Sequence, residues 1–200
     1  MKKTTALMVL VLLLASLALT SCSSGLSDEE AKAIAAELIE KSYEVNRIFF
    51  GEGLPHEEDA SPEDNTDYDV KPVNYLPVKS VEYHSTDDLK ALAEQVYTDS
   101  FLEPVFKSAF DGITDSDGRI YQYARYLDSF YYGLSIRSDA EEDAISSGRV
   151  FDTSTIKIVG QGRNYVFFSV MSTVEVEEPT EETLSLKDEG SGWRLDSPTY

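Results

Sequence analysis

The chain has 200 residues, which suits a single domain, and it carries 37 Asp and Glu against 17 Lys and Arg. A formal net charge of −20 excludes the class of proteins that hold nucleic acid on a basic surface. The single cysteine excludes a disulfide framework, so a hydrophobic core must hold the fold. The composition supports such a core, with 42% apolar residues, 12 Tyr and 9 Phe.

The first residues, 1–21, have the pattern of a lipoprotein signal peptide. Two lysines precede an aliphatic run, 6–18, that is shorter than the roughly 20 residues of a membrane-spanning helix. Leu19-Thr20-Ser21-Cys22 then resembles the lipobox of bacterial lipoproteins, whose cysteine receives fatty acyl chains such as palmitate and becomes the new N-terminus. We expect lipid attachment at Cys22 and a position on the outer face of the cell membrane. The alternative is an ordinary signal peptide followed by a chance cysteine.

The mature chain is expected to be more acidic than the full one. Cleavage removes two lysines, which lowers Lys and Arg from 17 to 15 against 37 Asp and Glu, so the net charge becomes −22. Residues 22–27 form a polar tether, and 28–200 form one domain. Such a charge repels nucleic acid and attracts basic partners. The alternative is that the acidity only provides solubility.

The first helix is predicted over 28–48 and is followed by an acidic loop, 51–72. Ser27 and Glu30 have the spacing of a capping box, and apolar residues then recur at helical spacing with Ser42 in one of the apolar positions. The loop is either a linker or an ordered segment that covers a groove. A short edge strand, broken by Pro77, follows over 74–83.

Two further helices are predicted before the chain changes to strand periodicity. Ser85 or Thr86 begins the second. Ser100 and Glu103 suggest a capping box for the third, which places Pro104 in its first turn. Asp111-Gly112 ends it.

Apolar and polar side chains alternate through much of the rest of the chain, and this period of two predicts strands. Residues 119–127 alternate as one strand, which 130–136 either continue or pair back against. Short turns then separate strands at 155–159, 165–176, 184–186 and 193–195. Helices followed by such a meander predict an α+β fold, with the helices packed on one face of a curved antiparallel sheet. The element order is similar to that of cystatin-like and NTF2-like folds.

Aromatic and arginine residues are concentrated in the stretch 119–132, which also contains Phe130. Tyr and Arg are common anchors of protein interfaces, so we predict a partner-binding surface there. Its candidate residues are Arg119, Tyr121, Tyr123, Arg125, Tyr126, Tyr131 and Tyr132. The alternative is that these side chains fill the core, as alternation requires for about half of them.

Catalytic patterns are weak. The only imidazole bases, His56 and His84, are expected to be exposed, and no nucleophile elbow, phosphate loop or zinc-protease motif occurs. Residues 115–118 (DSDG) lack the first and twelfth ligands of a calcium loop, so a turn into the next strand is the better interpretation. We expect no enzyme activity, no cofactor and no metal.

Three stretches resemble clostridial lipoproteins of the IseA family: 49–55 (FFGEGLP), 85–90 (STDDLK) and 192–200 (GWRLDSPTY). The family is named for an inhibitor of D,L-endopeptidases, the NlpC/P60-type cysteine peptidases that cut peptidoglycan stem peptides. The resemblance implies inhibition of such an autolysin, with a basic cell-wall peptidase as partner. The lipobox and the acidic 51–72 segment depart from the secreted type of that family.

A competing hypothesis is a ligand-binding or scaffold lipoprotein with a pocket between helices and sheet. A deep concavity lined by Tyr121, Tyr123 and Phe168 would favour this pocket. A filled core, with the acidic loop across a surface groove, would favour inhibition. An enzyme comes third and would require His84 in a cleft beside a carboxylate.

Overall fold

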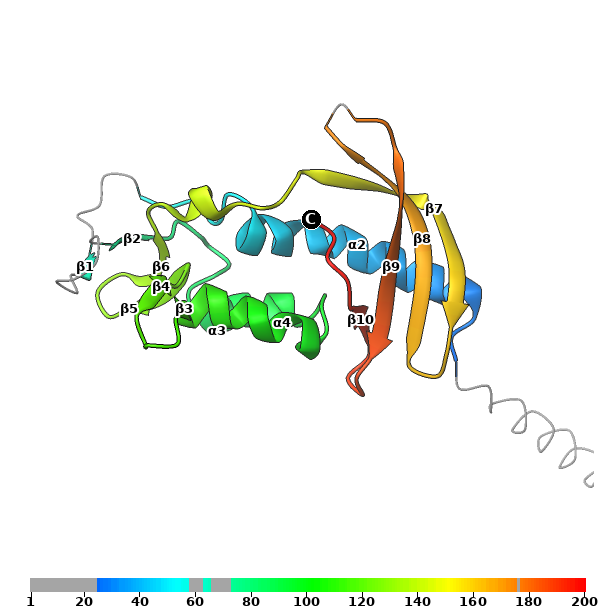
Figure 1. The fold of residues 1–200 in the computed structure, drawn as a ribbon, viewed down its shortest axis with the longest axis horizontal. Coiled ribbons are helices and arrows are strands. Elements are labelled where there is room, and N and C mark those ends of the chain that lie inside the picture. Colours follow the sequence, from blue (N-terminus) through cyan, green and yellow to red (C-terminus); the bar gives the residue numbers. More distant parts are fainter. Residues whose placement is uncertain (1–24, 58–62, 66–72, 176) are drawn as a thin grey trace, which may run out of the picture.

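The computed structural model describes residues 25–57, 63–65, 73–175 and 177–200, and these residues form an α+β fold (Figure 1). The long helix α2 (Asp28–Phe50) links two four-stranded antiparallel sheets at opposite ends of the molecule. A third sheet among the described residues has two strands. The α+β prediction is confirmed, although the strands divide among these sheets rather than forming one curved sheet.

Helix α2 begins where its sequence predicts. The Ser27 hydroxyl accepts the Glu30 amide, while the Glu30 carboxylate accepts the Ser27 amide, so the capping box is complete. The helix runs two residues past the predicted end and stops at Gly51. One face is buried along its whole length: Ala31, Ala35, Leu38, Ile39, Ser42, Val45, Asn46, Ile48, Phe49 and Phe50.

The predicted meander forms the sheet at the N-terminal end of α2. Its strands are β7 (Arg149–Gln161), β8 (Tyr165–Val174), β9 (Thr180–Asp188) and β10 (Trp193–Leu195), in the order β10-β9-β8-β7. β7 begins six residues before the predicted strand. Val166, Phe168 and Val170 are buried in the core, as their alternation predicts. Val176, predicted on the same face, lies outside the described residues.

The second sheet differs from the prediction. It has the order β1-β2-β6-β5, from β1 (Glu63–Asn65), β2 (Val73–Pro77), β6 (Gly133–Arg137) and β5 (Tyr126–Ser129). The edge-strand prediction is wrong, because β2 lies between β1 and β6. Pro77 is tolerated because it is the last residue of β2. β1 also places a strand inside the predicted acidic loop, whose segments 58–62 and 66–72 lie outside the described residues.

Helices α3 (Thr86–Ala93) and α4 (Asp99–Phe106) pack beside α2, and a π-helical turn, Lys107–Asp111, extends α4. α3 has the predicted cap, a box formed by Ser85 and Asp88. The cap of α4 is Thr98 and not Ser100, since the Thr98 hydroxyl accepts the Phe101 amide and donates to Asp196 at 2.5 Å. Pro104 therefore lies inside α4 rather than in its first turn, where it removes one helical hydrogen bond.

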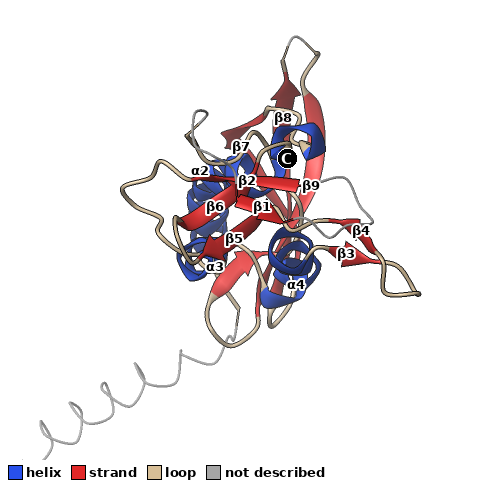
Figure 2. Cartoon of the chain, turned by 90° about the vertical axis from the view of Figure 1, so that its left-hand side faces the viewer, coloured by secondary structure: helices blue, strands red, loops and turns tan. Residues whose placement is uncertain are grey.

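The predicted single strand at 119–127 is also wrong. β3 (Ile113–Thr114) and β4 (Ile120–Gln122) form a separate hairpin, which projects from the side of the molecule (Figure 2). The chain then crosses to β5 in the second sheet, and β6 pairs back against β5. The 115–118 turn is confirmed, because the Asp115 carboxylate accepts the amides of Asp117 and Arg119, each at 2.9 Å.

A buried hydrogen-bond network ties the last residues of the chain to α2. The Tyr97 hydroxyl donates to the Asn46 carbonyl oxygen at 2.7 Å, and the Asn46 amide donates to the Thr199 hydroxyl at 2.8 Å. Thr199 donates in turn to Ser42, also at 2.8 Å. This network explains why Ser42 and Asn46 occupy the buried face of an otherwise apolar helix stripe.

We predict that the protein loses stability at alkaline pH, because burial raises the pKa of Tyr97 and of Tyr75 to about 12. An unfolded tyrosine titrates near pH 10, so each buried phenol contributes stability that is complete below about pH 10. That contribution falls as pH rises from about 10 to about 12, by up to about 1.4 kcal/mol per pH unit for each tyrosine.

Urea unfolding at stepped alkaline pH measures this loss. Tyr97→Phe has no phenol to titrate at that position, so its stability should fall less steeply than the wild type's over the same pH range. Equal slopes for the two proteins would contradict the assignment to Tyr97.

Candidate functional site

Three consecutive exposed aromatic side chains lie in the turn between β5 and β6, which we call the aromatic turn (residues 130–132). Phe130 is 93% exposed, Tyr131 77% and Tyr132 45%. The Ser129 hydroxyl accepts the amides of Tyr131 and Tyr132, each at 3.2 Å, and so fixes the turn. The rings of Phe130 and Tyr131 meet edge to face, with centroids 5.2 Å apart. The turn therefore presents ordered aromatic rings to solvent.

Acidic residues lie near the contact between this turn and the start of α3. The Asp128 carboxylate accepts the amide of Thr86 at 2.9 Å and its hydroxyl at 2.8 Å, which joins the turn to the start of α3. Asp87 in the first turn of α3 and Glu82 just before it are both exposed. Aromatic rings bordered by carboxylates suit a partner surface that is both apolar and basic.

Three other residues of the predicted surface belong to the β3–β4 hairpin and the segment after it. Arg119 is exposed, Tyr121 is 83% exposed and Tyr123 is partly buried. They lie in a different sheet from the aromatic turn (Figure 2). The predicted patch is therefore divided between two surface elements.

The remaining two predicted residues are buried, so their assignment to the surface is wrong. Arg125 is 5% exposed and Tyr126 is fully buried. Arg125 donates to the carbonyls of Ile48 at 3.1 Å, Ala140 at 2.8 Å and Gly51. The Tyr126 hydroxyl also donates to Ile48, at 3.0 Å. Both side chains satisfy carbonyls that the C-terminus of α2 leaves without helical partners, and the cation suits the negative end of the helix dipole.

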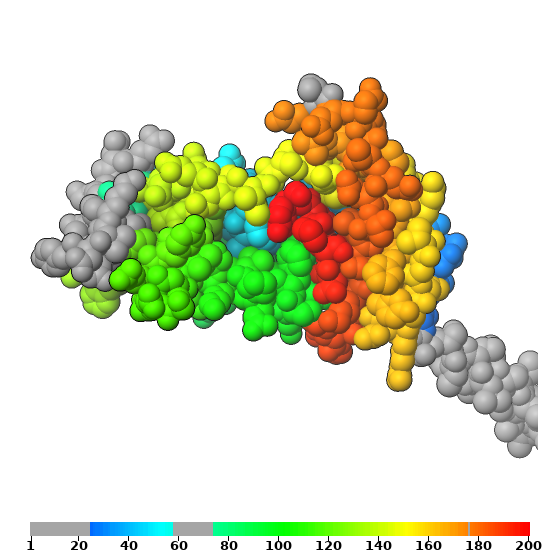
Figure 3. All heavy atoms as spheres, in the orientation of Figure 1, coloured from blue at the N-terminus to red at the C-terminus, as the bar shows by residue number. Residues whose placement is uncertain are grey.

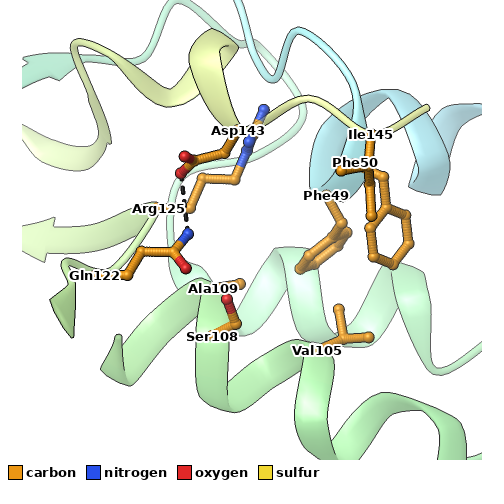
Figure 4. A pocket seen from close by; sticks show the side chains of 9 residues that line it. All are labelled: Phe49, Phe50, Val105, Ser108, Ala109, Gln122, Arg125, Asp143 and Ile145. Carbon is orange, nitrogen blue, oxygen red and sulfur yellow. Dashed lines mark hydrogen bonds between the residues drawn. The ribbon is translucent and has the colours of Figure 1, made fainter. Parts of the chain in front are cut away.

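A groove runs along α4, and we call it the α4 groove. One part has a volume of about 400 Å³ and lies between α4, the end of α2 and the short 3-10 helix Ala140–Asp143 (Figure 4). Its lining is Phe49, Phe50, Val105, Ser108, Ala109, Gln122, Arg125, Asp143 and Ile145. Figure 4 shows the aromatic and aliphatic side chains at one end and the polar ones at the other, where Gln122 donates to Asp143 at 3.0 Å.

The second part of the groove, of about 610 Å³, continues past Phe50 and Val105 to the end of the chain. There Tyr200 stacks on Phe50 with ring centroids 3.9 Å apart. Figure 3 shows the C-terminal segment, in red, between the green helices and the orange strand β9. Among the residues that the structure describes, Phe168 is fully buried and Tyr121 projects on its hairpin, so these two do not line the concavity proposed for a ligand-binding lipoprotein.

Sequence reasoning missed Arg137, which lies beside this groove. Its guanidinium is paired with Asp139 at 2.5 Å and with Asp143, and it donates to the Tyr123 carbonyl at 2.6 Å. The pattern of β6 gives no signal for it, because a basic residue at the end of a strand is ordinary. The ion pairs fix Asp143, and thereby the polar end of the groove.

The comparisons with known proteins do not identify the chain. No family model and no curated protein matches it. The functional assignment therefore depends on the surfaces described above and on the sequence resemblance.

The two histidines do not line the α4 groove. His84 is exposed, and its backbone amide donates to Asp88 at 2.8 Å. His56 is partly buried, and its ring lies 3.4 Å from the Leu54 carbonyl. In the described ranges, no group of three His, Cys, Asp or Glu side chains is placed to hold a metal ion.

The expected lipid-attachment residue, Cys22, lies outside the described residues. Within the part of the chain that the structure describes, no helix is both long and apolar enough to cross a membrane. Gly25, the first described residue, lies beside the turn between β7 and β8.

Proposed function

We propose that this protein is a lipid-anchored extracytoplasmic inhibitor that binds a basic cell-wall peptidase of the NlpC/P60 type. The observation that carries the proposal is the aromatic turn, whose Phe130 and Tyr131 rings are exposed, mutually packed and held by Ser129. A monomer gains nothing in folding free energy from rings that remain in water. Rings of this kind anchor protein interfaces when a partner covers them.

The charge of the chain supports a basic partner. A mature chain at −22 attracts a basic protein over several ångströms and speeds encounter more than it strengthens the final complex. Hydrolases that act on an anionic wall gain from a basic face, because it holds them on their substrate. The exposed residues Glu82 and Asp87 flank the segment 84–86, which contacts Asp128 and Gly133 on either side of the aromatic turn, and their carboxylates suit such a face.

The resemblance of 49–55, 85–90 and 192–200 to the IseA family supports a D,L-endopeptidase as the target. All three segments have structural roles here. Phe49 and Phe50 line the α4 groove, and residues 85–90 begin α3. Thr199 joins the buried network, and Tyr200 stacks on Phe50 in the groove. The proposal includes no enzyme activity.

The lipid anchor is tested separately from inhibition. The mature protein isolated from the membrane fraction should begin at Cys22 and carry the mass of a diacylglyceryl group. An unmodified thiol or an intact 1–21 segment would remove the anchor from the proposal and leave the inhibitor to be tested alone.

Replacing the three rings of the aromatic turn by serine (Phe130→Ser, Tyr131→Ser, Tyr132→Ser) should raise the inhibition constant at least about 30-fold. One hot-spot aromatic contributes roughly 2 kcal/mol, and 1.4 kcal/mol is a factor of ten. The measurement is titration of a purified NlpC/P60 peptidase with residues 23–200 at low salt. Tyr165→Ser, at the opposite end of the molecule, is the matched control and should inhibit like the wild type.

Two results would overturn this proposal. One is no inhibition by the wild-type domain at a large molar excess in low salt. The other is an inhibition constant that is unchanged in the triple variant, provided that its circular dichroism and unfolding match those of the wild type. An association rate that does not fall with added salt would exclude electrostatic steering alone.

A second candidate function is ligand binding in the α4 groove, which is supported by its volumes of about 400 and 610 Å³. An apolar wall formed by Phe49, Phe50 and Val105 suits a small apolar or glycan ligand. Val105→Trp fills this groove without touching the aromatic turn. Binding of muropeptides, measured by ligand-observed NMR, should vanish in Val105→Trp and persist in the triple serine variant if the groove is the site.

A further inference from the structure

The β7–β8 hairpin is the one long segment of the mature chain without acidic residues. From 153 to 174, 22 residues pass with no Asp or Glu, in a chain that carries 37 of them. Lys157 and Arg163 lie within this stretch, and both are exposed. An acid-free basic segment of this length is unusual in so acidic a protein.

Apolar side chains occupy the same hairpin on the face away from α2. Val159 is 59% exposed, Tyr165 44% and Phe167 45%. Tyr165 and Phe167 are paired, with ring centroids 5.4 Å apart. The neighbouring residue on β9, opposite Tyr165, is Lys187, whose ammonium group is paired with Glu189 at 2.8 Å and so adds no free charge at this edge. The inner face of β8 is already filled, by Val166 and Phe168 against the core, so these rings face outward.

The tether leaves the domain at this hairpin. A Cβ on Gly25 would lie 3.9 Å from the Gly162 carbonyl oxygen in the β7–β8 turn. Figure 1 shows the start of α2 and this turn at the same end of the molecule. Three peptide units separate Gly25 from Cys22, so the cysteine lies at most about 11 Å away along the chain.

We propose that the outer face of the β7–β8 hairpin lies against the phospholipid surface beside the acyl chains of Cys22, an inference that rests on the proposed lipid attachment. Tyrosine and phenylalanine partition to the membrane–water interface, and Lys157 and Arg163 pair with anionic headgroups. The nearest acids along the chain, Asp28, Glu29 and Glu30, face the positive end of the α2 dipole.

This contact would orient the whole domain. Helix α2 has 23 residues and is therefore about 34 Å long. The sheet that carries the aromatic turn lies at its other end (Figure 1). With the β7–β8 hairpin on the membrane, Phe130 and Tyr131 point away from it toward the wall, where a peptidase partner would be met.

The test uses the native cysteine as the anchor. Residues 22–200 are coupled through Cys22 to a maleimide lipid in vesicles of equal parts phosphatidylcholine and phosphatidylglycerol. In a Trp193→Phe background, Phe167→Trp reports on the hairpin and Tyr131→Trp on the aromatic turn. Brominated lipids should quench Phe167→Trp several-fold more than Tyr131→Trp. Adding Tyr165→Ser to Phe167→Trp should reduce that quenching.

Equal quenching of the two probes would overturn the proposal. So would a blue shift of Phe167→Trp that depends on protein concentration without vesicles, because that result assigns the face to a second copy of the chain. The chemical coupling supplies the anchor, so the outcome is independent of whether the cell lipidates Cys22 and of whether the domain inhibits a peptidase.

Discussion

Arg125→Ala is expected to lower the free energy of unfolding by about 2 kcal/mol or more, because two carbonyls lose their side-chain donor at once and each unsatisfied buried group costs roughly 1–3 kcal/mol. These carbonyls belong to Gly51 and Ala140, whereas the Ile48 carbonyl keeps the Tyr126 hydroxyl as a donor. Gly51 ends α2 and Ala140 belongs to the 3-10 helix, so the variant loosens both walls of the α4 groove. Urea unfolding followed by circular dichroism measures the loss.

Matched variants separate this role from a general effect of charge. Arg119→Ala removes the same charge from an exposed position and should change stability by less than about 0.5 kcal/mol. Arg125→Lys keeps the charge but lacks the planar fork that reaches three carbonyls, so it should recover little of the loss. If Arg125→Ala unfolds at the same urea concentration as Arg119→Ala, the capping role of Arg125 is wrong.

This position also shows why the recognition surface was only partly predictable. Tyr and Arg are enriched both at interfaces and at buried helix ends, and the stretch 119–132 contains both uses. Phe130 and Tyr131 extend into solvent from a turn, whereas Arg125 and Tyr126 reach across to carbonyls of α2 more than 70 residues earlier. The composition identifies the stretch as unusual, but only the tertiary contacts distinguish the exposed side chains from the buried ones.

Sequence patterns predicted structure correctly where the stabilising contacts join residues that are close in the sequence. The capping box of Ser27 lies within four residues of sequence and forms as predicted, and α3 begins after Ser85, one of its two predicted starts. The meander of β7 to β10 was likewise predictable from alternation and short turns. The cap of α4 was not, because the Thr98 hydroxyl is held by Asp196, almost a hundred residues away.

Alternation over 119–127 failed for a different reason. A period of two places side chains on opposite faces, but it does not state which sheet each half of the run joins. The Tyr75 hydroxyl donates to the Ala124 carbonyl at 2.7 Å, in the segment where the chain leaves the β3–β4 hairpin for β5. The α4 groove was beyond reach for the same reason, since Phe50, Val105 and Tyr200 come from three distant segments.

The two ends of the molecule have opposite surface chemistry, and this contrast gives the functional proposals a common geometry. At one end, exposed aromatic rings lie near the start of α3 with its exposed acidic residues Glu82 and Asp87, which suits a basic protein. At the other, rings are bordered by Lys157 and Arg163, which suits anionic lipid. α2 separates them, so anchoring at one end leaves the other free for a partner.

Gly112→Ala is expected to cost about 3–5 kcal/mol, because this residue adopts a backbone conformation that is essentially reserved for glycine. Its φ of 78° and ψ of −177° lie in that region, where another residue costs about 1–3 kcal/mol. A Cβ would also meet the Gln122 carbonyl oxygen at 2.5 Å, a backbone atom that cannot move aside as a side chain does.

Gly118→Ala is the control. The φ of Gly118 is also positive, at 80°, but no atom lies within 4 Å of its added Cβ, so the variant should cost only about 1 kcal/mol. Urea unfolding of both variants tests the prediction, and equal costs would show that the close approach of the β3–β4 hairpin to the end of the α4 segment does not constrain the fold.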